Sequence, residues 1–237
     1  MNADTARALT GEFLGSALLA AVVVGSGIAA QNLSPSDIGL QLFENAFATA
    51  LGLAVLIVLF QTVSGAHFNP VVSLVDAALH RKGVPLTAAY IPTQILGCIG
   101  GTVLANLMFA APAIAWSTTD RASAPHLLAE VVATAGLVLL IFALVRTDRS
   151  HLAGPAVGAY IGAAYFFTSS TSFANPAITI GRAFTDTFAG IAPASVLPYI
   201  AAQLIGGALG WMLVRLLFPA ASPAPLPTDQ RTSATRP

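Results

Sequence analysis

Two asparagine–proline pairs are the residues of this sequence that most clearly point to chemistry. Asn69-Pro70-Val71 and Asn175-Pro176-Ala177 lie 106 residues apart, and a short apolar stretch follows each. Asparagine is a preferred N-cap of a helix, and proline is preferred at the first helical position because its missing N–H is not needed there. Both pairs therefore predict the start of a helix too short to cross a bilayer. Paired short helices at matching positions of two repeats indicate a solute pathway.

The side-chain amide of each asparagine offers two separate functions. Its Oδ1 can accept a hydrogen bond from the helix that it caps, which leaves the NH2 group as a donor to a passing molecule. Two such donors beside two positive helix ends favour neutral solutes with an oxygen atom, whereas ions would keep their desolvation cost. We therefore predict that Asn69 and Asn175 are central donors of a pore. The alternative is that they only cap buried helices.

Two acidic residues lie inside predicted membrane spans at equivalent places. Glu12 is near the start of the first span, and Glu130 is near the start of the fourth. Ionisable residues are costly within a membrane and usually have a function there. We expect both carboxylates to accept hydrogen bonds from the non-helical backbone that leads into each short helix. A proton relay is the alternative.

The composition is that of a membrane protein and argues against several other classes. Hydrophobic residues make up 56% of the chain and charged residues 8%, compared with about 25% charged residues in a typical soluble domain. Ten basic and ten acidic residues give no indication of nucleic-acid binding. The single cysteine, Cys98, is expected to be a packed thiol instead of a soft-metal ligand. We expect no cofactor, no metal and no enzymatic activity.

Six stretches are long enough to cross a bilayer, which requires roughly 20 apolar residues. They cover approximately residues 8–30, 41–62, 86–110, 126–146, 152–172 and 195–218. The two short helices, at about 68–79 and 174–185, are predicted to be re-entrant, which requires protein or water around their non-helical ends. The sequence thus predicts an all-α membrane protein with a channel domain over 1–218. Residues 219–237 are expected to be a disordered cytoplasmic tail.

A second repeated pattern predicts how the two halves are related. Tyr90-Ile91-x-x-Gln94-x-x-Gly97-x-x-x-Gly101 recurs 109 residues later as Tyr199-Ile200-x-x-Gln203-x-x-Gly206-x-x-x-Gly210. Each half, about 8–110 and 126–218, contains three spans and one half-helix. Three is an odd number, so the halves insert with opposite orientations, as an inverted 3+3 repeat.

The basic residues predict that both termini are cytoplasmic. With the N-terminus inside, only Arg121 and Arg182 fall on the outer side. The cytoplasmic set is Arg7, Arg81, Lys82, Arg146, Arg149, Arg215, Arg231 and Arg236.

The sequence resembles the aquaporin, or major intrinsic protein, family over about residues 8–218. The residues that carry the resemblance are Glu12-Phe13-Leu14-Gly15, Ser64-Gly65-Ala66-His67-Phe68-Asn69-Pro70-Val71, Gln94-x-x-Gly97, Glu130, Asn175-Pro176-Ala177 and Gln203-x-x-Gly206. The resemblance implies a right-handed bundle of six helices and two half-helices that is a passive channel. It also implies a homotetramer in which each subunit has its own pore, in a lipid bilayer that we expect to be the bacterial inner membrane.

Departures from the family pattern predict the solute. In water-selective members the third residue after the second asparagine is arginine, whereas here it is Ile178, and the first motif ends in Val71 instead of alanine. An ungapped comparison gives Thr49, Ala163 and Ser172 as the other filter residues. The unusual segment 171–175 leaves the register of the last two open by one or two residues. Small side chains without arginine imply passage of neutral polyols or hydroxylated metalloids as well as water.

Two further residues are predicted near the ends of the pathway. We expect His67 at the cytoplasmic vestibule. Arg182 follows Ile178 by four residues on the same helix face, and we expect it to contact the pore mouth or lipid headgroups. The alternative is that Arg182 partly compensates for the missing filter arginine.

The segment 175–193 resembles that of a bacterial aquaporin subgroup often encoded beside arsenic-resistance genes. This resemblance implies passage of trivalent arsenicals, which are neutral at physiological pH. A water-selective aquaporin is one alternative. An ion-coupled secondary transporter is an alternative of another class, because such transporters also use inverted repeats and broken helices, but it would need an acid or base near the midplane.

Overall fold

The computed structural model describes residues 2–80 and 84–219, and the regular structure in these ranges is entirely helical. Its α-helices are α1 (Ala3–Leu33), α2 (Ile38–Ser64), α3 (Pro70–His80), α4 (Val84–Met108), α5 (Ala124–Arg146), α6 (Ala153–Phe167), α7 (Pro176–Gly181) and α8 (Pro193–Leu217). Two 3₁₀ turns, η1 (Ser150–Leu152) and η2 (Arg182–Phe184), adjoin α6 and α7. The predicted tail lies outside the described residues apart from Pro219.

Five of these helices, α1, α2, α4, α5 and α8, are long and apolar enough to cross a membrane. The sixth crossing, α6, has only 15 residues, or about 22 Å at 1.5 Å per residue. The predicted C-terminal boundary of this span, residue 172, is therefore wrong, because the helix ends at Phe167. The helix ends at Phe167 because Thr168 is extended, and its hydroxyl donates to the carbonyl of Ala164 at 2.6 Å. The chain then continues through a non-helical segment into α7.

The long helices pack as two similarly built halves. In the first half α4 packs along α1, in the second half α8 packs along α5, and α2 packs on α6 between the halves. A Cβ atom on Gly97 would lie 2.6 Å from the carbonyl oxygen of Phe13 in α1. A Cβ atom on Gly206 would lie 2.5 Å from that of Val131 in α5. The two glycines hold equivalent places in the sequence repeat, so each allows the same close approach in its own half.

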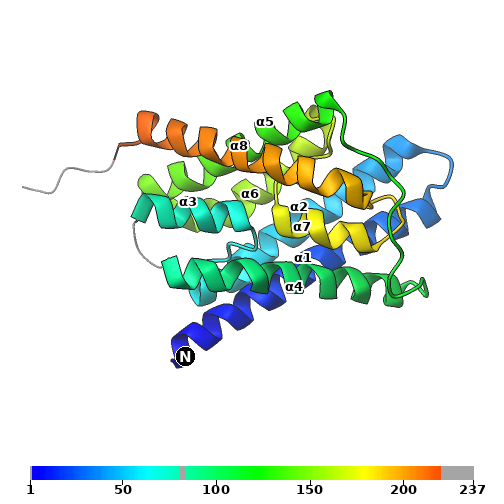
Figure 1. Cartoon of the computed structure of the whole chain (residues 1–237), viewed down its shortest axis with the longest axis horizontal. Coiled ribbons are helices and arrows are strands. Elements are labelled where there is room, and N and C mark those ends of the chain that lie inside the picture. Colours follow the sequence, from blue (N-terminus) through cyan, green and yellow to red (C-terminus); the bar gives the residue numbers. More distant parts are fainter. Residues whose placement is uncertain (1, 81–83, 220–237) are drawn as a thin grey trace, which may run out of the picture.

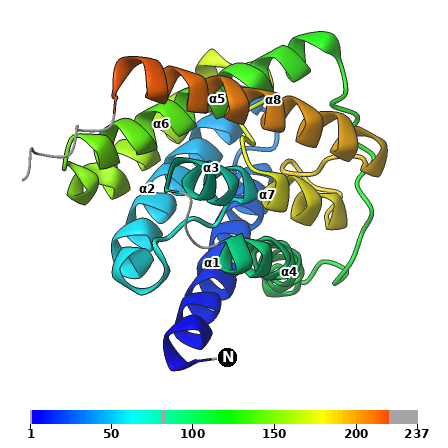
Figure 2. The same ribbon diagram turned by 60° about the vertical axis from the view of Figure 1, so that its left-hand side comes forward.

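The two short helices lie in the interior of the bundle. Figures 1 and 2 show α3 and α7 between α4 and α8, with α3 toward one end of the molecule and α7 toward the other. Each follows a segment without helix, at 65–69 and at 168–175. The starts of α3 and α7 therefore lie close together inside the bundle.

The connections of the chain are divided between the two ends of the bundle. In Figure 1 the first residues of α1 and the last residues of α8 lie at the same end. The connections 109–123 and 185–192 lie at the opposite end. The start of α1 and the end of α8 are therefore on one side, as an even number of crossings requires. The basic residues Arg81, Lys82, Arg231 and Arg236 are outside the described residues.

Candidate channel site between the two short helices

Asn69 and Asn175 each bond the helix that follows. The Oδ1 of Asn175 accepts hydrogen bonds from the backbone N–H groups of Ala177, at 2.9 Å, and Ile178, at 3.3 Å. The Oδ1 of Asn69 accepts from the N–H of Val71 at 2.9 Å. These bonds satisfy donors at the start of each short helix that have no partner within the helix itself.

The same two side chains join the halves of the molecule. The Nδ2 of Asn69 donates to the carbonyl oxygen of Ala174 at 2.7 Å, and the Nδ2 of Asn175 donates to that of Phe68 at 2.8 Å. One hydrogen of each NH2 group is thereby used in the protein. Since an amide nitrogen carries two hydrogens, one donor remains on each asparagine. The expectation that the whole NH2 group faces a solute is corrected to one hydrogen per side chain.

Each loop before a short helix is bonded to one buried carboxylate. Glu12 accepts hydrogen bonds from the backbone N–H groups of the two residues that precede Asn69, at 3.0 and 2.7 Å. Glu130 accepts the equivalent bonds from Phe173 and Ala174, at 2.9 and 2.8 Å. Both carboxylates are inaccessible to solvent. They hold backbone that has no helical or sheet partner, which is otherwise costly inside a membrane.

These bonds stabilise an unusual backbone. Ala66 and Phe68 in the first loop have φ angles of 52° and 48°, and Ser172 and Ala174 in the second loop have 51° and 48°. Residues other than glycine are uncommon in this left-handed region and are found there mainly where the surroundings impose it. The matching positions show that both loops adopt the same conformation.

Each half also contains one buried glutamine, and the two glutamines make equivalent hydrogen bonds. Gln94 donates to Glu12 at 2.7 Å and to the hydroxyl of Ser73 at 3.0 Å. Gln203 donates to the other buried carboxylate at 2.6 Å and to the hydroxyl of Thr179 at 2.9 Å. Each glutamine therefore connects a carboxylate to the short helix of its own half.

His67 lies on the side of the first short helix. Its Nδ1 is 3.0 Å from the hydroxyl of Ser73, and its ring meets that of Tyr90 edge-on at 5.6 Å between centroids. His67 lines the central cavity and also a second cavity, which reaches Gln61 and Asp76. The imidazole therefore stands between the centre of the molecule and that second cavity.

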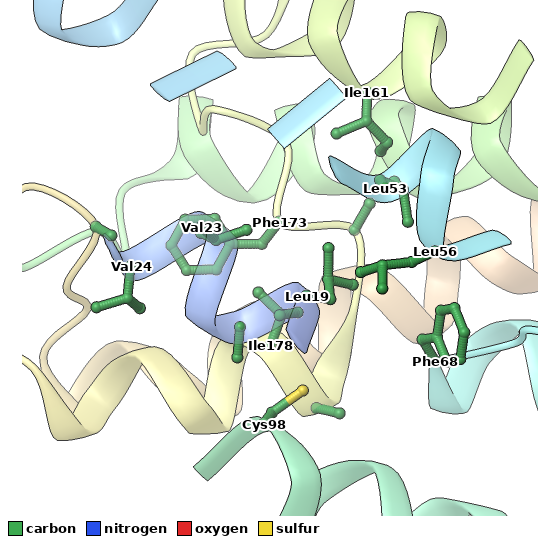
Figure 3. Close-up of a cluster of buried hydrophobic side chains, with 14 of the residues drawn as sticks. Leu19, Val23, Val24, Leu53, Leu56, Phe68, Cys98, Ile161, Phe173 and Ile178 are labelled. Atoms are coloured by element: carbon green, nitrogen blue, oxygen red, sulfur yellow. The ribbon is translucent and has the colours of Figure 1, made fainter. Parts of the chain in front are cut away.

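A cavity runs past the point where the short helices meet. It is lined by Asn69 and Asn175 together with Thr49, Ser172 and Ile178, three of the predicted filter residues. Much of its wall is apolar, including Leu19, Val23, Leu53, Ile161 and Phe173, which Figure 3 shows within one cluster of buried side chains. The arrangement combines a few polar groups with an apolar wall, as in sites for small molecules.

The fourth predicted filter residue, Ala163, does not line this cavity. Its side chain is exposed on the outside of α6. Tyr165 lines the cavity instead, and its hydroxyl oxygen is 3.2 Å from that of Thr49. The register is thus shifted by two residues, within the range that the unusual segment 171–175 left open. On a helix a shift of two residues moves a side chain to nearly the opposite face.

Arg182 is placed differently from the mouth or headgroup contact expected from the sequence. It is 2% exposed and lines the central cavity with Ile178. Its Nε donates to the carbonyl oxygen of Ala189, and its guanidinium carbon lies 3.4 Å from the centroid of the Phe173 ring. Phe173 was not among the site residues predicted from the sequence. Its equivalence to His67, two residues before the asparagine of its own motif, was the available signal.

The described residues contain no group of histidine, cysteine or acidic side chains that could hold a metal ion. Cys98 is fully buried, and its Sγ lies 3.6 Å from the carbonyl oxygen of Ser16. Two short helices that meet beside a cavity within a bundle of membrane-crossing helices define a membrane channel. The chain belongs to the major intrinsic protein family, whose model matches residues 1–174.

Individual relatives agree with this assignment. The chain is 44% identical to aquaglyceroporin AqpS of Rhizobium meliloti (strain 1021) over 97% of its own length and 98% of the relative. It is 34% identical to aquaporin NIP1-4 of Oryza sativa subsp. japonica over 71% of this chain and 64% of that one. The X-ray structure of the aquaglyceroporin from Plasmodium falciparum has the same fold, with a TM-score of 0.69 and 21% identity. The structural match covers 89% of this chain and 95% of the Plasmodium falciparum chain.

The chain is therefore an integral membrane protein and a passive membrane channel for small solutes. Its fold is that of the aquaporins, with six membrane-crossing helices and two half-helices in an inverted 3+3 repeat. The predictions of the family and of the all-α fold class are confirmed.

Proposed function

We propose that this channel conducts small uncharged solutes larger than water. The two solute classes are polyols such as glycerol and hydroxylated metalloids such as arsenous acid. The observation that carries the proposal is Ile178, which lines the central cavity and is 4% exposed. An apolar side chain here offers no hydrogen bond to water and no fixed charge. The relative named aquaglyceroporin is consistent with the polyol class.

The proposed roles of the other residues follow from their contacts. The remaining N–H of Asn69 and of Asn175 donates to a solute oxygen at the centre. Thr49 and Ser172 form the filter with Ile178, and Tyr165 takes the place of Ala163. His67 belongs to the inner vestibule. Glu12 and Glu130 are structural acids, because each is already bonded by the loop that it supports.

We also propose the context in which the channel works. The chain forms a homotetramer in the bacterial plasma membrane, with both termini in the cytoplasm. One channel domain spans residues 1–218, with repeats at about 8–110 and 126–218, and it needs no cofactor and catalyses no reaction. Two observations support this orientation: the start of α1 and the end of α8 lie at the same end of the bundle, and the basic residues of the sequence favour a cytoplasmic N-terminus.

The test is stopped-flow light scattering of proteoliposomes in gradients of glycerol and of arsenous acid. The native protein should pass both solutes. Ile178→Arg should lower solute permeability by roughly tenfold or more while water still passes, because it narrows the cavity and adds a charge. Ile178→Leu is the matched control, since it keeps an apolar side chain of the same size, and it should retain solute flux.

Other outcomes would identify the alternatives. A native channel that passes water and neither solute would be a water-selective aquaporin, contrary to the proposal. Solute flux that follows an imposed proton gradient would indicate an ion-coupled transporter. Glycerol flux without arsenous acid flux would restrict the proposal to polyols.

A further inference from the structure

The buried guanidinium of Arg182 forms no ion pair with any residue that the structure describes. The ion pair found among the described residues joins Arg7 and Asp4, and no described carboxylate lies within 4.0 Å of the Arg182 guanidinium. A buried cation without a carboxylate in direct contact is costly, and ionisable residues at membrane depth usually serve a pathway. The side chain nevertheless lines the same cavity as Asn69 and Asn175. Packing alone therefore does not account for a charged residue at this position.

The surroundings hold the guanidinium in one orientation. Its Nε is bonded to the carbonyl of Ala189, and one face of its plane lies on the Phe173 ring. That ring is itself fixed, because the Phe173 N–H is bonded to Glu130 and the ring meets Tyr199 edge-on at 5.2 Å. A cation that is stacked and bonded through Nε keeps its two terminal nitrogens in a defined place.

A second arginine fixes the segment that holds Arg182. The Nε of Arg121 donates to the carbonyl of Gly190 at 2.8 Å, and its Nη2 donates to that of Phe188 at 3.1 Å. These carbonyls flank Ala189, which accepts the bond from Arg182. Arg121 lies in the long connection between α4 and α5, and burial lowers the pKa of its guanidinium from the ordinary value. Arg121 is therefore a positioning residue for Arg182.

The terminal nitrogens of Arg182 are the unused part of this arrangement. Among the residues that the structure describes, neither Nη1 nor Nη2 donates to a protein acceptor, whereas Nε does. Arg182 lies one helical turn beyond Ile178 on the same face, and the hydroxyls of Thr49 and Tyr165 line the same cavity. Free N–H donors beside an aromatic face suit a solute with hydroxyl groups on one edge and carbon on the other.

We propose that Arg182 is a selectivity residue of this channel, placed one turn outward of Ile178. Its terminal nitrogens donate to the oxygens of neutral solutes, and its fixed charge repels cations from the pathway. The inference rests on the proposed channel for neutral solutes, and it names the residue that restores charge discrimination where Ile178 supplies none. The filter is then wide and apolar at Ile178 and cationic at Arg182.

The experiment measures methylammonium and proton permeability in proteoliposomes of the full-length chain, with glycerol and water permeability in the same preparations. Arg182→Gln keeps a neutral donor and should raise the permeability to both cations by about tenfold or more. Arg182→Lys should keep most of the exclusion, because it keeps the charge. Arg146→Gln is the control, since Arg146 is bonded to the carbonyl of Phe218 at the end of α8 and does not line the cavity.

An unchanged cation permeability in Arg182→Gln would overturn the inference, and so would an equal increase in Arg146→Gln. If Arg182→Gln gives no folded protein in gel filtration, Arg121→Gln decides the question. That variant should raise cation permeability by a smaller factor because the segment holding Arg182 is loosened, and no rise would overturn the inference. Native glycerol flux tests the proposed function separately. If the native channel passes water alone, the proposed conduction of neutral solutes is refuted. If Arg182→Gln leaks cations in that case, the inference about Arg182 still holds.

Discussion

At the scale of single residues, the centre of the molecule depends on side chains that each make several hydrogen bonds. Asn69 and Asn175 bond their own half-helix through Oδ1 and the opposite loop through Nδ2. An aspartate would lose the donor, and a serine could not span both partners. The residue type is therefore set by this pair of bonds, and solute contact uses only the hydrogen that is left.

Glu130 tests whether the buried acids are structural. Its two oxygens accept hydrogen bonds from two backbone N–H groups and from Gln203. Glu130→Gln places an NH2 group where one acceptor stood, so one buried donor loses its partner, at a cost of about 1–3 kcal/mol. We expect a lower unfolding temperature in detergent, with the remaining folded protein still conducting solute.

Glu44→Gln is the control for this substitution. Glu44 accepts one bond, from the hydroxyl of Ser34 at 2.9 Å, and glutamine can keep that bond. The unfolding temperature of the Glu44→Gln variant should be close to that of the native protein. A Glu130→Gln protein of native stability that no longer transports would favour the proton relay and contradict a structural role.

At the scale of elements, the close contact between α1 and α4 positions the first half-helix. Gln94 on α4 and Glu12 on α1 meet at 2.7 Å and together hold the loop before α3. The distance between the two helices is set by the glycines that face α1. A Cβ atom on Gly101 would collide with the carbonyl of Ala17. The hydrogen-bond network of the site thus depends on packing several residues away from it.

Two neighbouring glycines of α4 allow a matched test. Gly101→Ala forces α4 away from α1 and should destabilise the protein by about 1–3 kcal/mol, as overpacking does. Gly100→Ala adds a Cβ that meets nothing within 4 Å, so it should be neutral or slightly stabilising, since alanine favours a helix by about 1 kcal/mol. Thermal unfolding in detergent gives both values. Equal effects of the two substitutions would show that helix spacing is not limiting.

At the scale of the whole molecule, both halves of one chain contribute residues to the wall of the cavity, including the two central asparagines. In the homotetramer that we propose, each chain should therefore conduct independently of its neighbours. Native mass spectrometry should give an assembly of four copies of the 24.2 kDa chain. A dimer or a monomer as the largest species that retains activity would contradict the proposed assembly.

Mixed assemblies test independent conduction directly. When native chains and Ile178→Arg chains are combined at varying ratios before reconstitution, glycerol permeability should fall in proportion to the native fraction. A pore shared between subunits would instead give a much steeper fall, because one altered chain would block it. Assemblies of native chains with Ile178→Leu chains are the control and should retain permeability at every ratio.

The sequence by itself determined the fold class, the inverted repeat and the central asparagines. Membrane-spanning helices follow from local composition, because a bilayer tolerates few other backbones. The half-helices follow from capping chemistry within a few residues of Asn69 and Asn175. The repeat was visible because both halves must place the same side chains around the same centre.

The tertiary structure alone decided which side chains border the pathway. The face of α6 that borders the cavity carries Tyr165, whereas Ala163 is exposed, and the packing of α6 on α2 selects that face. The position of Arg182 depends on Phe173 and Ala189, which approach it from other segments of the chain. An arginine near the membrane boundary can be stabilised either by water or by stacking on a buried aromatic ring. Only contacts distant in sequence select between them.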